Sequence, residues 1–162
     1  MEELIDYYKK MYRFDEWNTT CNNFTEMGDK HFFVRTKLLA PFQQTSRSIL
    51  TPIEAGVLYT LINDVCSQKH ENSCYRIRVT PFRTEETAKN GLLRRLLSPV
   101  PFVRDDKFTE RSICFISTTD MWQSLAFMSR HVVVQIIPLS EKYHKDELYM
   151  LARLIEQQIY EA

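Results

Sequence analysis

Glycine is scarce in this chain of 162 residues, which contains only Gly28, Gly56 and Gly91, each isolated from the others. Average usage is roughly 7%. The phosphate-binding loops of Rossmann and Walker sites need clustered glycines, because the backbone must come close to the phosphate and adopt conformations that a side chain blocks. The sequence therefore argues against a nucleotide cofactor of these kinds, and no other motif predicts a cofactor.

Cysteine and histidine are present, but not at the spacings that metal sites use. The chain has Cys21, Cys66, Cys74, Cys114, His31, His70, His131 and His144. None of them belongs to a CxxC, HxH or HExxH pattern, so we expect no metal. Scattered cysteines are typical of packed, reduced thiols in an intracellular protein. A GxSxG elbow for acyl transfer is also missing.

Long apolar runs are absent as well. No stretch approaches the roughly 18 residues that cross a bilayer, and Met1 is followed at once by charged residues rather than by an apolar secretory segment. We therefore expect an intracellular protein, cytoplasmic or nuclear, which is neither secreted nor bound to a membrane. On that expectation, the glycosylation sequons that begin at Asn18 and Asn23 are ordinary loop residues.

Two apolar runs in the C-terminal half indicate the fold class. Residues 112–118 (SICFIST) and 131–139 (HVVVQIIPL) are almost continuously apolar, as expected for strands that are buried on both faces. The segment between them, 120–130, is read as a crossover helix, which would make the two strands parallel. With 44% hydrophobic and 26% charged residues, the chain is long enough for one domain, 1–162, with a sizeable core.

The remaining elements complete an alternation of helices and strands. We predict helices over 3–14, 51–68 and 142–161, another helix that begins after Thr84, strands over 31–39 and 74–82, and connections over 40–50 and 98–111. This order predicts a single-domain α/β three-layer sandwich, with a central, mostly parallel or mixed four-stranded sheet and helices on both faces.

The two ends of the chain carry more apolar side chains than one sheet face needs. The candidate interface residues are Tyr7, Tyr8, Tyr12, Phe14 and Trp17 in the aromatic N-terminal segment 1–17, Tyr149, Met150 and Leu154 in the C-terminal helix 142–161, and Phe102 in the proline-rich loop 98–111. Aromatic residues and methionine are favoured in interface cores. The leading hypothesis is a non-enzymatic protein-interaction module, a subunit or adaptor of an intracellular hetero-oligomer. The alternative is that both helices simply cover the sheet.

A basic middle segment supports two further hypotheses. Residues 76–111 contain 9 basic and 5 acidic side chains, although the whole chain is balanced at 21 of each. A nucleic-acid-binding subunit with a nuclease-like fold would use Arg76, Arg78 and Arg83, with Arg94 and Arg95 nearby. The opposing interpretation is a solvated strand face that protects a sheet edge. The third hypothesis is a metal-dependent phosphodiester hydrolase that uses Asp105 and Lys107.

Overall fold

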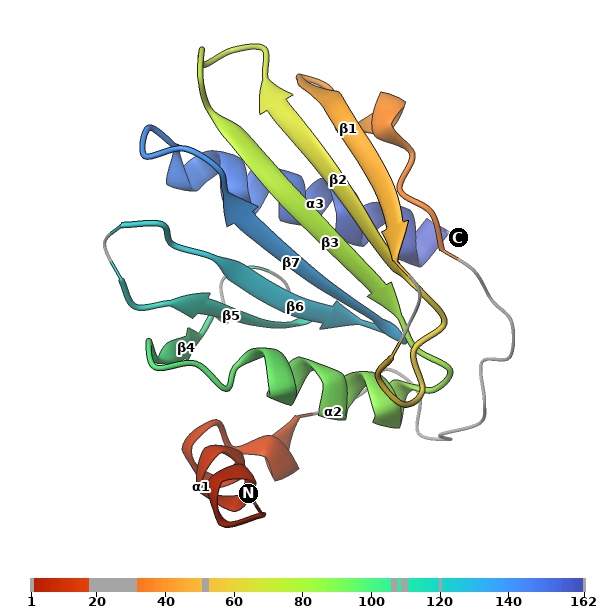
Figure 1. The fold of residues 1–162 in the computed structure, drawn as a ribbon, viewed down its shortest axis with the longest axis vertical. Coiled ribbons are helices and arrows are strands. Elements are labelled where there is room, and N and C mark those ends of the chain that lie inside the picture. Colours follow the sequence, from red (N-terminus) through yellow and green to blue (C-terminus); the bar gives the residue numbers. More distant parts are fainter. Residues whose placement is uncertain are drawn as a thin grey trace.

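The computed structural model describes residues 2–17, 32–50, 53–105, 108, 111–119 and 121–161. Within these residues the chain forms three α-helices and one seven-stranded antiparallel sheet with the order β1-β2-β3-β7-β6-β5-β4 (Figure 1). The strands are β1 (Phe42–Leu50), β2 (Thr60–Ser67), β3 (Cys74–Pro81), β4 (Phe102–Arg104), β5 (Ile113–Ser117), β6 (Leu125–Ser129) and β7 (Val132–Pro138). The helices are α1 (Glu2–Met11), α2 (Glu85–Arg95) and α3 (Lys145–Glu161).

Helices cover the two faces of this sheet unequally. α3 packs on the face that carries Leu61, Ile77 and Val134, whereas α2 packs on the opposite face over β5, β6 and β7 (Figure 1). The second face is more open over β1 to β3, where Arg76 is exposed and Asp64 is half-buried. In the part of the chain that the structure describes, no helix combines the length and the apolar character needed to cross a membrane.

The predicted fold class is wrong, because the sheet has seven strands and every pair of neighbours is antiparallel. The strands predicted over 112–118 and 131–139 exist as β5 and β7, and both are largely buried. The error lies between them, since 125–129 is β6 and not part of a crossover helix. β6 joins β7 through a tight turn at Arg130 (φ 52°), and so short a connection permits only antiparallel pairing.

A second error concerns residues 40–68. The region predicted as a polar connection contains β1, and the region predicted as a helix over 51–68 contains β2. Along β2 the buried side chains are Leu61, Asn63 and Val65, which is the alternation of a strand. Of the strand predicted over 31–39, the described residues form an irregular stretch over 32–35 followed by the 3-10 helix Thr36–Leu39.

The elements with strong local signals agree with their predictions. β3 and α3 lie where the sequence pattern places them, and α2 begins after Thr84, whose side chain accepts a hydrogen bond from the backbone N–H of Thr87. Such a cap satisfies one of the otherwise unpaired amides at the start of a helix. α1 also matches its prediction. The aromatic N-terminal segment packs close to α2.

Candidate functional site

Two of the N-terminal aromatic residues anchor α1 to the body of the domain. Tyr12 is 6% exposed and Trp17 is 3% exposed, and both rings contact Phe115 of β5 at centroid distances of 5.4 and 5.2 Å. The Tyr12 hydroxyl donates to the carbonyl of Leu96 (3.3 Å) and accepts from the N–H of Phe102 (3.1 Å). Burial raises the pKa of Tyr12, so the hydroxyl stays protonated and available as a donor.

Two more aromatic residues line the boundary between α1 and the body. Tyr8 is half-buried, and its hydroxyl lies 3.5 Å from the carbonyl of Ser98. Phe14 is half-buried, and the Lys89 ammonium lies 4.3 Å from the centre of its ring, within range for a cation–π contact. Packing against the sheet and α2 therefore accounts for four of the five aromatic residues predicted at an interface.

The fifth aromatic residue belongs to an exposed stripe on the other side of α1. Tyr7 is 61% exposed, and Leu4 and Met11 are 49% and 40% exposed. These positions are three and four residues apart, so they share one face of the helix. We call these three residues the apolar stripe. The broad apolar arc of α1 thus divides into a half that packs inward and a half that faces solvent.

A groove of about 590 Å³ lies at the lower end of the stripe, between α1 and β4. Its lining consists of Met11, Tyr12, Arg13, Glu16, Pro101, Phe102, Val103, Arg104 and Phe115. Val103 on the β4 wall is 49% exposed, whereas the predicted interface residue Phe102 is 9% exposed at the base. Arg13 and Arg104 stand on opposite walls. The apolar stripe and this groove together form what we call the α1–β4 surface.

The three predicted interface residues of α3 lie together, but on the other face of the sheet. Tyr149, Met150 and Leu154 line a hollow of about 440 Å³ with Asp146 and Arg153. Tyr149 and Leu154 pack against the core, and only Met150 is exposed, at 37%. The predicted interface set is therefore split between two faces, and its α3 part is mostly structural.

Three of the five predicted basic residues, Arg76, Arg94 and Arg95, are held by acidic partners. Arg76 makes two hydrogen bonds with the Asp64 carboxylate, at 2.9 and 3.0 Å. Arg94 and Arg95 both contact Glu54, at 3.0 and 3.1 Å, on the surface of α2. These pairs neutralise part of the excess positive charge that the sequence shows over 76–111. The paired arginines lie on two separate elements, β3 and α2.

Asp64→Asn is expected to lower the free energy of unfolding by less than about 1 kcal/mol near neutral pH, because the pair is partly exposed. The Arg76 guanidinium lowers the pKa of Asp64 below its usual value of 3.8. The contribution of the Asp64–Arg76 pair to stability is therefore fully present above pH 3.8, the usual pKa of Asp64. It is lost as the pH falls through the lower pKa that Asp64 has in the folded state. Urea unfolding across the acid range checks this, and variant and wild type must converge at the acid end.

Of the two residues of the hydrolase hypothesis, the structure describes only Asp105. Asp105 accepts a hydrogen bond from the Tyr149 hydroxyl, and burial together with this carboxylate raises the pKa of Tyr149. Lys107 lies outside the described residues. Among those described, no group of three or more His, Cys, Asp or Glu side chains is placed to hold a metal ion.

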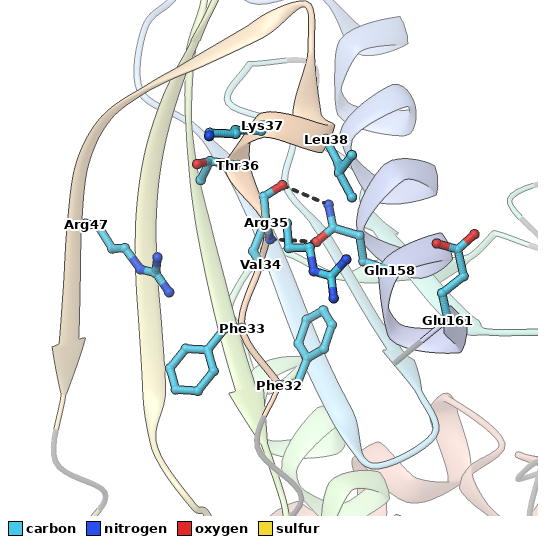
Figure 2. A pocket seen from close by; sticks show the side chains of 10 residues that line it. All are labelled: Phe32, Phe33, Val34, Arg35, Thr36, Lys37, Leu38, Arg47, Gln158 and Glu161. Carbon is cyan, nitrogen blue, oxygen red and sulfur yellow. Dashed lines mark hydrogen bonds between the residues drawn. The ribbon is translucent and has the colours of Figure 1, made fainter.

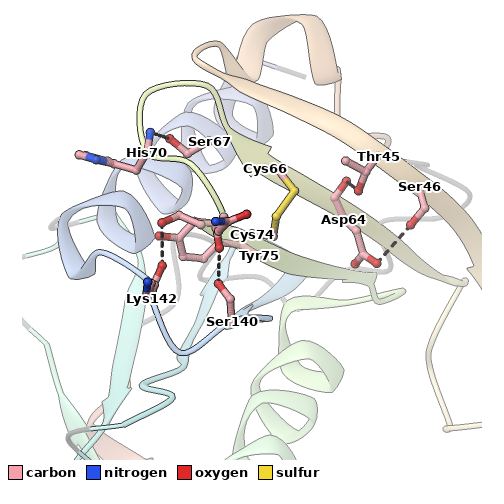
Figure 3. The surroundings of a disulfide bond; sticks show 12 residues. Thr45, Ser46, Asp64, Cys66, Ser67, His70, Cys74, Tyr75, Ser140 and Lys142 are labelled. Atoms are coloured by element: carbon pink, nitrogen blue, oxygen red, sulfur yellow. Dashed lines mark hydrogen bonds between the residues drawn. A yellow bond between two sulfur atoms is a disulfide. The ribbon is translucent and has the colours of Figure 1, made fainter.

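A disulfide joins Cys66 of β2 to Cys74 of β3, directly across the strand pair (Figure 3). Cys114 is a free thiol whose pKa burial raises well above the usual value, and Cys21 and both sequons lie outside the described residues. Sequence reasoning missed the bond because a helix over 51–68 cannot place Cys66 opposite Cys74. Reading this segment as the first strand of a hairpin would have indicated it.

Comparison with solved structures gives a match in fold. No family model matches this chain, and no curated protein does. Among solved structures, the extracellular domain of PknH from Mycobacterium tuberculosis is similar, with a TM-score of 0.52 and 10% sequence identity. The match covers 80% of this chain and 93% of that domain. At this identity the likeness concerns the fold alone.

The expected intracellular location, cytoplasmic or nuclear, is corrected by the disulfide. Disulfides form and persist in oxidising environments such as the cell exterior, and they are rare in the cytosol and nucleus. The Cys66–Cys74 bond therefore contradicts the expectation that the cysteines are packed, reduced thiols. This bond points away from an intracellular location.

Proposed function

We propose that this chain is a protein-interaction domain that works outside the cytosol, without catalysis, by binding a partner chain on the α1–β4 surface. The observation that carries the proposal is the exposure of Leu4, Tyr7 and Met11 on a helix whose other apolar side chains already pack inward. Isolated exposed apolar residues are ordinary, but a row of them beside a groove forms a continuous patch of the kind that marks interaction sites.

Rigidity of α1 supports this assignment. Tyr12 and Trp17 fix the helix through buried rings and through hydrogen bonds to Leu96, Phe102 and the backbone of Tyr12 itself. The apolar stripe is therefore held in one orientation before a partner arrives. A surface that is already ordered loses less conformational entropy on binding, so more of its contact energy contributes to affinity.

Charges at the groove indicate the chemistry of the partner. Arg13 is on the α1 wall and Arg104 is on the β4 wall, while the single acidic side chain of the lining, Glu16, lies 3.9 Å from Arg13. A segment with apolar side chains for the stripe and acidic side chains for the two arginines complements this arrangement. We take this partner to be a different chain, which is the hetero-oligomer that the sequence predicts.

Leu4→Asp and Met11→Asp are expected to weaken partner binding by about tenfold or more, because each places a charge in the apolar contact. A photoreactive amino acid at position 7, introduced in the native host, identifies the partner by covalent capture. The affinity of the purified pair is then measured by calorimetry. Met121→Asp is the matched control, since Met121 is 60% exposed and lies outside the α1–β4 surface.

Both variants are expected to fold, because the side chains they replace are exposed. Substitutions of Tyr12 are unsuitable, since they would remove a buried anchor together with any contact. The proposal is abandoned if position 7 captures no more protein than position 121, or if Leu4→Asp and Met11→Asp bind the identified partner as tightly as the wild type does.

A further inference from the structure

A second groove lies at the opposite edge of the sheet, where residues 32–38 pass between β1 and the C-terminal end of α3 (Figure 2). Its volume is about 690 Å³, within the range of small-molecule sites. The lining consists of Phe32, Phe33, Val34, Arg35, Thr36, Lys37, Leu38, Arg47, Gln158 and Glu161. Because β1 and β4 are the two edge strands, this groove is separate from the α1–β4 surface.

Two sets of contacts hold the wall of this groove in place. The Gln158 side chain accepts from the N–H of Arg35 (2.7 Å) and donates to its carbonyl (3.2 Å), as Figure 2 shows. The Tyr59 hydroxyl accepts from the N–H of Phe32 (2.6 Å), and the Phe33 ring stacks on Tyr59 with centroids 5.2 Å apart. The groove is thus built by tertiary contacts and does not need a ligand to form.

Positive charge collects on this lining. Arg35, Lys37 and Arg47 come from two different segments, and in the described part of the chain none of them forms an ion pair with a carboxylate. The one acidic residue of the lining, Glu161, accepts a hydrogen bond from the Gln157 side chain (2.9 Å). This arrangement contrasts with Arg76, Arg94 and Arg95, which are all paired.

Apolar side chains lie beside these cations. Phe33 and Leu38 are 47% and 50% exposed, although each has apolar neighbours along the same segment. The Arg47 guanidinium carbon is 5.7 Å from the centre of the Phe33 ring, which brings a cation next to an exposed apolar surface. A ligand that has a negative head and an apolar body matches both features at once.

Two unpartnered polar side chains lie near Arg47, outside the groove lining. Asn63 pairs with Arg47 across β1 and β2 and is fully buried, yet neither atom of its side-chain amide has a hydrogen-bond partner. The buried side-chain oxygen of Gln44, on the same sheet face, also has none. Native proteins keep few such groups, because each costs free energy when buried. Neither Asn63 nor Gln44 lines the groove, so these amides are not contacts for a head group.

We propose that this groove binds a small anionic amphiphile, a carboxylate or phosphate monoester that carries an alkyl chain. Arg47 binds the head through charge-assisted hydrogen bonds, Arg35 and Lys37 add positive potential along the same lining, and the chain covers Phe33 and Leu38. Nucleic acid suits the groove less well, because a run of phosphates needs a longer basic track than three residues supply. A uniformly acidic peptide such as polyglutamate would likewise leave the exposed Phe33 and Leu38 poorly covered.

Calorimetry on the oxidised full chain tests the proposal, with decanoate and decyl phosphate kept below their micellar concentrations. Decyl glucoside and decyltrimethylammonium are the controls, since they carry the same chain with a neutral or a cationic head. Both acids are expected to bind, and Arg47→Glu is expected to weaken their binding about tenfold or more. Arg78→Glu is the matched variant, because Arg78 lies on the opposite face of the same sheet.

Binding of only one of the two acids supports the proposal and identifies the head group. The proposal is overturned if neither acid binds, if decyl glucoside binds as tightly as decanoate, or if Arg78→Glu weakens binding as much as Arg47→Glu does. Binding of a polyglutamate peptide with no response to the decyl acids also overturns it. Loss of partner binding at the α1–β4 surface has no bearing on these outcomes.

Discussion

Gly91→Ala is expected to destabilise the protein by about 3 kcal/mol, although the same change in an exposed helix stabilises by roughly 1 kcal/mol. Gly91 lies within α2 and is buried against Phe82. A methyl group at position 91 would meet the Cζ atom of that ring and stand 2.8 Å from both Cε atoms. Helix propensity and steric overlap thus act in opposite directions here, and the overlap is the larger effect.

The Phe82 ring has little room to yield. It is fully buried, the backbone N–H of Phe82 donates to the carbonyl of His131 (2.7 Å), and the Arg95 guanidinium lies 5.6 Å from the ring centre. Moving the ring would separate α2 from the sheet. The strain is therefore expected to appear as a loss of global stability rather than as a local adjustment.

Urea unfolding of Gly91→Ala measures this effect, and the double variant Gly91→Ala/Phe82→Leu is the diagnostic control. Phe82→Leu alone removes core volume and destabilises, but it also makes space for the new methyl group. The double variant is expected to lose less stability than the two single variants lose in total, which is the sign of direct coupling. A Gly91→Ala variant as stable as wild type would show that α2 packs differently.

The agreement and the errors of the sequence analysis have the same origin. Continuous apolar runs report that a strand is covered on both faces, and β5 and β7 are indeed covered. They do not report direction, which is decided by the length and shape of the connection. Because 120–130 was read as a helix, the sharp turn at Arg130 was missed, and the parallel arrangement followed from that single assignment.

Ambiguous periodicity explains the error over 51–68. Val57, Leu61 and Val65 fit a helical stripe, but together with Tyr59 and Asn63 they also fit the alternation of a strand, and pairing with β1 and β3 decides the outcome. Tertiary context of this kind is not visible in a local window. The disulfide was lost for the same reason, since it exists only when β2 and β3 form a hairpin.

The candidate sites differ in how visible they are in sequence. The excess of apolar side chains on α1 was apparent from the sequence. Which of them face solvent depends on the orientation of the helix, which the hydrogen bonds of Tyr12 with Leu96 and Phe102 fix. The groove that Arg35, Lys37 and Arg47 line was not apparent from the sequence, because its walls come from residues 32–38, from β1 and from the end of α3. A site assembled from three distant segments has no local motif.

Removing the disulfide with the double substitution Cys66→Ser/Cys74→Ser is expected to lower the free energy of unfolding by about 2.5 kcal/mol, from the entropy of closing a short loop. The two cysteines are eight residues apart and link adjacent strands. The cross-link restricts the unfolded chain, so its loss makes unfolding more favourable. Urea unfolding of the variant and of the wild type, each with and without reductant, measures the difference.

The reductant is the internal control for this prediction. Wild type in reductant is expected to match the double variant, and the variant is expected not to respond to reductant at all. Alkylation of the denatured, unreduced protein from its native source then reports the cysteine state directly, with Cys114 labelled and Cys66 and Cys74 protected. Labelling of Cys66 before reduction would remove the disulfide from the native protein and, with it, the argument that the chain works in an oxidising compartment.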